Sequence, residues 1–216
     1  MSDLFSLRPS LSITPKTKHA NALNLAKKKL RAEMRLQRRA LNFQQQKTAS
    51  RKLISNLKTN GLLQRHQHIA LYLANDGEIS PNDLIPQLHK FKKQVYLPVI
   101  HPLKKQQMVF CQITSTTKFQ KNSYGIEEPI FKFSRRLPAK YLSLVFMPLV
   151  AFDENGNRMG MGGGFYDRSF EFKLNEKKAR PRLIGLAHDF QKQALLPLEP
   201  WDIPLHGIMT EKQFYA

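Results

Sequence analysis

The sequence lacks most of the features that mark secreted or membrane-bound proteins. It has one cysteine, Cys111, among 216 residues, which excludes an internal disulfide and is typical of a reducing compartment. The longest nearly unbroken apolar run, residues 142–152, is about half as long as a membrane-spanning helix requires. Residues 1–24 contain no apolar stretch of about seven or more residues, which a signal peptide would need. We therefore expect a cytoplasmic protein without a membrane segment, with Cys111 in its core.

Acidic residues are also scarce. The chain has 16 Asp and Glu residues against 35 Lys and Arg residues, which gives a net charge of +19. Such an excess attracts anions, including nucleic acids, nucleotides and polyanionic small molecules. Lysine-rich solvated surfaces would give the same count. Because charge alone specifies no partner, both interpretations stay open at this point.

No segment rich in Gly, Pro or Ser divides the chain. Apolar residues make up 41% and charged residues 24%, as in soluble globular proteins, and the length allows a sizeable core. Residues 1–24 are polar and rich in Ser, Thr and Lys, so we interpret them as a flexible N-terminal extension. Residues 25–216 are predicted to form a single domain.

Helical and strand patterns alternate along that domain. Helices are expected at residues 26–41, at about residues 44–58 and from Ser80 onward, and strands at residues 68–74, 94–100, 108–113 and 182–188. Because the strands are apolar on both faces, the pattern predicts an α/β sandwich with a largely parallel sheet. Ligands of such sheets bind beyond the carboxyl ends of the strands. The loops that follow these strands are therefore expected to carry the functional residues.

Glycine is scarce as well, and four of the ten glycines lie between Gly160 and Gly164. A helix-like segment, residues 165–174, follows this glycine loop. Glycine lets the backbone approach a ligand, and the first N–H groups of a helix can bind anions. Arg158 and Asp167 flank the loop and supply a phosphate partner and a ligand for Mg²⁺. The loop fits neither G-x-x-x-x-G-K-[ST] nor G-x-G-x-x-G, but its composition and flanks predict a nucleotide phosphate site.

The first expected helix carries a ridge of basic residues at steps of four and three: Lys27, Arg31, Arg35 and Arg38. Taken alone, this ridge has three interpretations. It is a solvated face, a nucleic-acid-binding helix, or a phosphate clamp formed by one or two of the four residues. No aromatic residue lies between Ala26 and Leu41, which disfavours the nucleic-acid interpretation.

The segment from Phe146 to Asp167 resembles the signature of the 5-formyltetrahydrofolate cyclo-ligase family, also called methenyltetrahydrofolate synthetases. Residues 26–31 resemble the family's opening basic helix, residues 72–78 its folate-contacting segment, and residues 196–205 its closing motif. The resemblance implies a three-layer α/β/α sandwich similar to the sugar-phosphate isomerase and CoA transferase-like fold. A phosphosugar isomerase is the rival enzyme on this fold, but no acid–base pair stands beside the glycine loop.

The resemblance implies ATP-dependent conversion of 5-formyltetrahydrofolate to 5,10-methenyltetrahydrofolate, with release of ADP and phosphate. The formyl oxygen would be phosphorylated, and N10 would then close the ring. The implied ATP contacts come from the first helix, Arg158 and the glycine loop: Lys27, Arg31, Arg158, Gly160, Met161, Gly162, Gly163, Gly164, Phe165 and Tyr166. The implied Mg²⁺ ligands are Asp167 and Asp202.

The folate contacts are expected from three residues outside the glycine loop. Leu73 and Glu78 belong to the folate-contacting segment, and Tyr124, in a turn-rich loop, is added as a residue for folate stacking. The expected partners are ATP and 5-formyltetrahydrofolate, whose polyglutamylated forms would suit the positive net charge. Nucleic acid is not expected as a partner, and the protein is expected to be a monomer.

Overall fold

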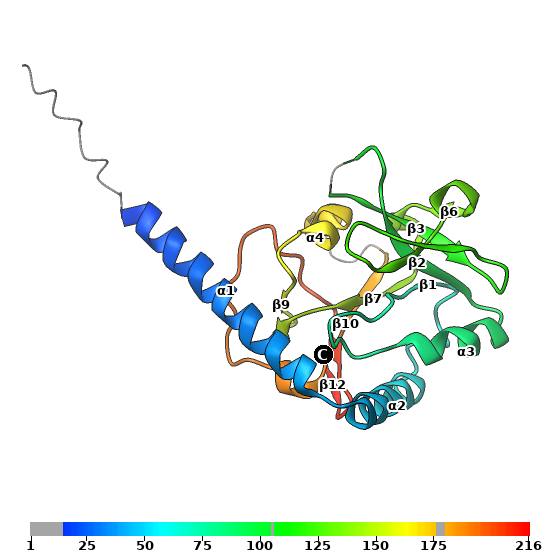
Figure 1. The fold of residues 1–216 in the computed structure, drawn as a ribbon, viewed down its shortest axis with the longest axis horizontal. Coiled ribbons are helices and arrows are strands. Elements are labelled where there is room, and N and C mark those ends of the chain that lie inside the picture. The colour runs from blue at the N-terminus through cyan, green and yellow to red at the C-terminus, as the bar shows by residue number, and fades with distance from the viewer. Residues whose placement is uncertain (1–14, 105, 176–179) are drawn as a thin grey trace, which may run out of the picture.

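The computed structural model describes residues 15–104, 106–175 and 180–216, and for residues 15–20 it describes the backbone alone. The strands of the central sheet are β1 (His68–Ala70), β2 (Gln94–Ile100), β3 (Met108–Ile113), β6 (Arg136–Leu137), β7 (Leu144–Pro148), β10 (Arg182–Leu186), β11 (Ile208–Met209) and β12 (Phe214–Tyr215). Within the described residues this sheet has eight strands, in the order β12-β11-β10-β7-β1-β2-β3-β6 (Figure 1). The strands from β11 to β2 are parallel, and antiparallel pairs close both edges.

The central strands are buried on both faces, as their continuous apolar sequences predicted. In β7, Leu144 and Phe146 belong to the core on one face, while Val145 and Met147 belong to the core on the other face. Side chains of a strand alternate between the two faces, so a strand that is apolar throughout needs a layer on each side. The parallel sheet expected from the sequence is therefore confirmed.

Helices lie on both sides of this sheet (Figure 1). On one face pack α2 (Phe43–Thr59) and α3 (Ile85–Lys90), whose buried leucines share a core with β1 and β7. On the other face lie α4 (Phe165–Ser169) and a 3₁₀ segment (Glu171–Leu174), anchored by the fully buried Phe170. The three-layer α/β/α architecture is confirmed. The second helical layer is thin, because α4 has only 5 residues.

The first helix, α1 (Pro15–Ala40), begins before the expected start at Ala26. Met34 is buried in a small cluster with Val150 and Met159, and Leu30 packs against the same cluster. The helix therefore includes residues 15–24 of the segment interpreted as an extension, while residues 1–14 lie outside the described residues. The division into an extension and one domain stays a prediction. Figure 1 shows the N-terminal half of α1 reaching beyond the body of the domain.

Two small hairpins and one shortened strand complete the fold. Both hairpins are antiparallel: β4 (Phe119–Lys121) pairs with β5 (Glu127–Pro129), and β8 (Ala151–Phe152) pairs with β9 (Arg158–Met159). The second hairpin turns at Asn155-Gly156, a dipeptide typical of tight hairpin turns, and Gly156 has a φ of +79°. Strand β1 ends at Ala70 and not at residue 74, because the chain leaves the sheet for the loop 71–78. Among the described residues, no helix is long and apolar enough to cross a membrane.

Candidate active site

The glycine loop joins β9 to α4 at the carboxyl end of the parallel strands. Gly162 has a φ of +94° and Gly164 a φ of +63°, a backbone region that side-chain-bearing residues rarely adopt. A Cβ at Gly164 would also lie 2.8 Å from the guanidinium of Arg168. These two positions therefore need glycine for conformational reasons. The expected order of strand, glycine loop and helix is present, with the β8–β9 hairpin inserted between β7 and the loop.

A buried ion pair links the two residues that flank the loop. The Nη2 of Arg158 donates to Oδ1 of Asp167 over 2.6 Å, and the Arg158 side chain is 4% exposed. The same Oδ1 accepts a 3.3 Å bond from the backbone N–H of Ile203. Among the residues that the structure describes, the Nε of Arg158 is buried without a hydrogen-bond partner. The Arg158 guanidinium of this pair therefore has one N–H donor, at Nε, that no described acceptor uses. It lies at the base of the glycine loop.

Helix α1 reaches this loop from the other end of the chain. The Nε of Arg31 donates to the carbonyl oxygen of Gly160 over 2.8 Å. The Nζ of Lys27 lies 3.1 Å from Oε1 of Glu199 and 3.9 Å from Oδ2 of Asp202. The Lys27 side chain is 9% exposed, so its ammonium is held between the helix and the closing segment. The cations that the sequence assigned to ATP phosphates are therefore gathered around the glycine loop.

The other half of the basic ridge contacts the loop 71–78. The Nε of Arg35 donates to Oδ2 of Asp76 over 2.7 Å, and Nη2 of Arg38 donates to the same oxygen over 2.9 Å. Arg38 is 1% exposed. Neither the solvated-face nor the nucleic-acid interpretation fits residues that face inward and hold acidic groups or backbone carbonyls. The ridge is a partly buried face of α1, with Lys27 and Arg38 buried and Arg31 and Arg35 half-buried.

Glu78 occupies the loop that Asp76 anchors. Its Oε2 accepts a 3.1 Å bond from the N–H of Asn75. Burial raises the pKa of Glu78 from 4.5 to about 7, although the Asn75 N–H and the Arg38 guanidinium favour the charged form. Burial, and after it the Glu78 carboxylate, raises the pKa of the Tyr166 hydroxyl. Glu78 is therefore close enough to Tyr166, the second residue of α4, to influence its hydroxyl.

The remaining two residues assigned to folate lie in different surroundings. Tyr124 is exposed at the turn of the β4–β5 hairpin, and its ring meets Phe165 edge-on at a centroid distance of 6.1 Å. The hairpin thus brings Tyr124 to the glycine loop. Leu73 is half-buried and packs against the core that α2 and α3 share with the sheet. Its contacts are those of a packing residue, and its role toward folate stays a prediction.

The two implied magnesium ligands lie near one another. Asp202 precedes Ile203, whose N–H bonds to Asp167, and Oδ2 of Asp202 accepts a 2.8 Å bond from the N–H of Glu199. In the described part of the chain, no group of three or more His, Cys, Asp or Glu side chains could hold a metal ion. Magnesium usually takes only one or two protein carboxylates and keeps its waters and phosphate ligands. Two aspartates beside a phosphate cradle are a suitable donor set for it.

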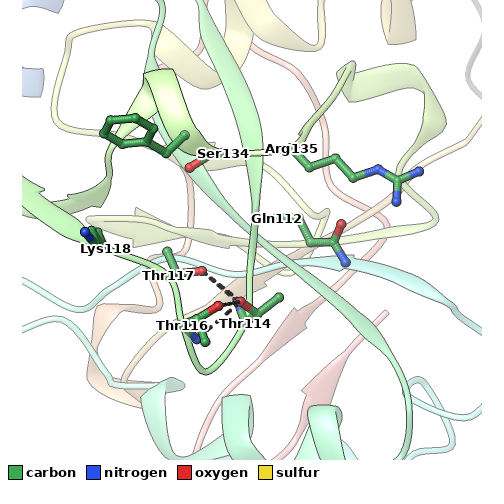
Figure 2. A pocket seen from close by; sticks show the side chains of 8 residues that line it. Gln112, Thr114, Thr116, Thr117, Lys118, Ser134 and Arg135 are labelled. Carbon is green, nitrogen blue, oxygen red and sulfur yellow. Dashed lines mark hydrogen bonds between the residues drawn. The ribbon is translucent and has the colours of Figure 1, made fainter.

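A hollow of about 530 Å³ lies away from these residues (Figure 2). Its walls are mostly polar: Gln112, Thr114, Thr116, Thr117, Lys118, Phe133, Ser134 and Arg135. It opens beyond the end of β3, whereas the start of β3 is bonded to α4 through Met108 N–H and Ser169 Oγ at 3.0 Å. Figure 2 shows Lys118 and Arg135 on opposite sides of the hollow. None of the predicted site residues lines it.

Two acidic residues at the site were missed by sequence reasoning. Asp76 accepts from the arginines of α1, and Glu199 pairs with Lys27 across 172 positions of the chain. Asp76 stands two residues before Glu78, and Glu199 belongs to the closing motif, so both were within segments already noted. Their partners could not be found from the sequence, because no local pattern reports contacts over such separations.

The fold and these contacts define an α/β protein with basic side chains clustered around a glycine loop, at the carboxyl end of its parallel strands. The model of the 5-formyltetrahydrofolate cyclo-ligase family matches residues 24–211. The chain therefore belongs to the 5-formyltetrahydrofolate cyclo-ligase family.

Individual relatives agree with this assignment. The chain is 41% identical to the 5-formyltetrahydrofolate cyclo-ligase of Haemophilus influenzae over 185 residues, which are 85% of this chain and 97% of the relative. It is 36% identical to that of Escherichia coli K12 over 182 residues, 84% of this chain and 98% of the relative. Among solved structures, the 5,10-methenyltetrahydrofolate synthetase of Aquifex aeolicus matches with a TM-score of 0.75 and 29% identity, covering 88% of this chain and 92% of its own.

Proposed function

We propose that this chain carries out the cyclo-ligase reaction at the rim between α1, the glycine loop and the loop 71–78. The overall reaction is that of its family: 5-formyltetrahydrofolate and ATP become 5,10-methenyltetrahydrofolate, ADP and phosphate. The observation that carries the placement is the contact of Arg31 with Gly160, which sets the basic face of α1 against the glycine loop. The family resemblance assigned both to ATP, although they lie in distant parts of the sequence.

The ATP side is formed by Lys27, Arg31, Arg158 and the backbone of the glycine loop. Phosphoryl transfer asks a protein mainly for positioning and charge stabilisation, which cations and backbone N–H groups provide. The γ-phosphoryl group passes to the formyl oxygen on N5. N10 then attacks the activated carbon and loses its proton, and phosphate leaves with the C–O bond electrons. No protein nucleophile is required, and the site is not arranged around one.

Asp167 and Asp202 are the residues that would hold magnesium. They are paired with Arg158 and Lys27 in the structure, so both carboxylates lie where phosphate oxygens would meet those cations. When bound, magnesium would neutralise part of the charge on the phosphates. The backbone N–H groups of Ile203 and Glu199 hold the carboxylates of Asp167 and Asp202, respectively. The protein thereby keeps each carboxylate beside its cation.

The folate side is formed by Glu78, Tyr124 and Leu73. A carboxylate can accept hydrogen bonds from the amino group and ring N–H of a pterin, and an exposed tyrosine beside Phe165 can stack on an aromatic ring. The net charge of +19 supports a preference for polyglutamylated folates, whose tails carry several negative charges. A cytoplasmic location is proposed, supported by the single, buried Cys111, and the protein is proposed to act as a monomer.

The direct test is to mix the protein with 5-formyltetrahydrofolate and MgATP and to follow the absorbance of the methenyl product. Product formation that requires ATP is expected. A phosphosugar isomerase would be indifferent to ATP, and absence of ATP-dependent product would overturn the proposal.

The location of the site is tested by substitution. Arg158→Ala should reduce turnover at least about 100-fold, since it removes a charge-assisted bond to phosphate worth about 3 kcal/mol. Arg51→Ala, an exposed arginine of α2, is the matched control and should behave like wild type.

A further inference from the structure

We infer that Asp76 is a positioning residue for the folate side of the site: it fixes the loop that presents Glu78 against helix α1. The inference rests on the proposed function, in which Glu78 contacts the pterin. It assigns a role to a side chain that touches neither substrate in that proposal. Three features of the loop 71–78 support this role: its anchoring charges, its backbone conformation and the hydrogen-bonded turn that contains Glu78.

Three arginines of α1 converge on one carboxylate. Oδ2 of Asp76 accepts from Arg35 over 2.7 Å and from Arg38 over 2.9 Å, while Oδ1 accepts from Arg39. The Asp76 side chain is 14% exposed and that of Arg38 is fully buried. Charge-assisted bonds of this kind are the strong ones, and removing one partner of a buried pair leaves an uncompensated charge. Asp76 is therefore the anchor of the loop on α1.

The backbone around Asp76 leaves the loop little freedom to move. Asp76 has a φ of +52° and Gly77 a φ of +74°, and a Cβ at Gly77 would lie 2.8 Å from the backbone of Arg38. The Gly77 carbonyl accepts from Gln46 over 3.1 Å and from Nε2 of His188 over 3.3 Å. The loop is thus pressed against α1 and bonded to α2 and to the segment after β10.

Glu78 belongs to the same turn. Its N–H donates to the carbonyl of Asn75 over 3.0 Å, while its carboxylate accepts from the Asn75 N–H. The turn 75–78 therefore moves as one unit, and displacement of Asp76 displaces the Glu78 carboxylate. Because Lys27 and Arg31 lie on the same helix as the three arginines, Asp76 also sets the distance between the folate and ATP sides of the rim.

The test is a double-mutant cycle on the full chain with Asp76→Asn, Glu78→Gln and the double variant. The measurements are KM for 5-formyltetrahydrofolate, KM for MgATP, kcat and the thermal midpoint. Asp76→Asn is expected to raise the folate KM about tenfold and to change the ATP KM less than threefold. In the Glu78→Gln background the same change is expected to raise the folate KM less than twofold, because the residue that Asp76 positions is already lost.

A purely structural role would give a different result. Asp76→Asn would then have equal effects in both backgrounds, or would affect the two KM values alike, and either result would overturn the inference. If Glu78→Gln alone leaves the folate KM unchanged, the proposed folate contact itself is wrong, which is a distinct outcome. If Asp76→Asn does not fold, Arg35→Gln replaces it in the cycle, because Arg35 is a half-exposed partner of Asp76. This variant should raise the folate KM about threefold, and only when Glu78 is intact. Arg51→Gln is the control and should change neither constant.

Discussion

The Nε of Arg31 lies 2.8 Å from the carbonyl oxygen of Gly160, a contact between residues 129 positions apart. It joins the helix that opens the domain to the loop that follows β9. A Cβ at Gly162 would lie 3.5 Å from the same guanidinium, so the arginine runs alongside the loop. The proposed site is therefore assembled from distant parts of the chain, with α1 as one of its walls.

The first prediction concerns Arg31. Arg31→Ala should raise the KM for MgATP about 10-fold to 100-fold, because a hydrogen bond from a charged group contributes about 1.5–3 kcal/mol. The KM for 5-formyltetrahydrofolate should change much less. Lys28→Ala removes an exposed cation about one turn earlier on the same helix and is the matched control. Equal effects of the two substitutions on the ATP KM would show that Arg31 acts only through net charge.

The second prediction concerns Asp167 and magnesium. Asp167→Asn should raise the Mg²⁺ concentration required for half-maximal activity about tenfold at fixed ATP, since the amide keeps the bond to Arg158 but loses the charge that attracts the ion. Titration of activity with Mg²⁺ measures the effect. Glu154→Gln removes an exposed carboxylate of the nearby β8–β9 hairpin as a control. If both variants follow the wild-type titration curve, Asp167 does not hold the metal.

The third prediction is a pH dependence of folate binding. Because the pKa of Glu78 is raised to about 7, its carboxylate is increasingly protonated as the pH falls from 8 to 6. The charged form is the better acceptor for the pterin N–H groups, so the folate KM should rise over this range. Glu78→Gln should have a higher KM that is nearly independent of pH. A wild-type KM that stays flat between pH 6 and pH 8 would argue against Glu78 as the pterin acceptor.

The fourth prediction applies the same pKa to stability. Glu78 is protonated more readily in the folded chain than in the unfolded chain, so its contribution favours folding below pH 4.5 and is lost as the pH rises through about 7. Glu78→Gln removes this dependence. Relative to wild type, the variant should gain about 2.5 kcal/mol in free energy of unfolding between pH 5 and pH 8, from 1.36 kcal/mol per pKa unit. Urea unfolding at the two pH values measures the difference, and a constant difference would contradict the raised pKa.

The fifth prediction concerns Tyr124. Tyr124→Ala should raise the folate KM about threefold to tenfold, because an aromatic pair contributes about 0.5–1.5 kcal/mol. Tyr124→Phe keeps the ring that meets Phe165 and should stay within twofold of wild type. The residue is exposed, so both variants should melt like wild type. If the alanine variant binds folate as wild type does, the β4–β5 hairpin does not reach the substrate.

The elements with a strong local signal were predicted well. The strands at residues 94–100 and 108–113 have the expected bounds in β2 and β3, and the helix expected at about residues 44–58 is α2, Phe43–Thr59. Strands β11 and β12 were not predicted, because strands of 2 residues carry no periodicity. The helix start at Pro15 was missed because residues 15–24 have no apolar stripe.

The sequence by itself determined the family, the α/β class and the identity of the charged and glycine residues at the site, because these depend on residue types and on spacings within single segments. Only the tertiary structure decided how those residues are paired. The basic ridge had three interpretations until α1 was seen to face inward, with Arg31 on Gly160 and Arg38 on Asp76. Such pairings depend on how helices and loops pack around the sheet, and a contact across more than a hundred residues leaves no trace in local periodicity.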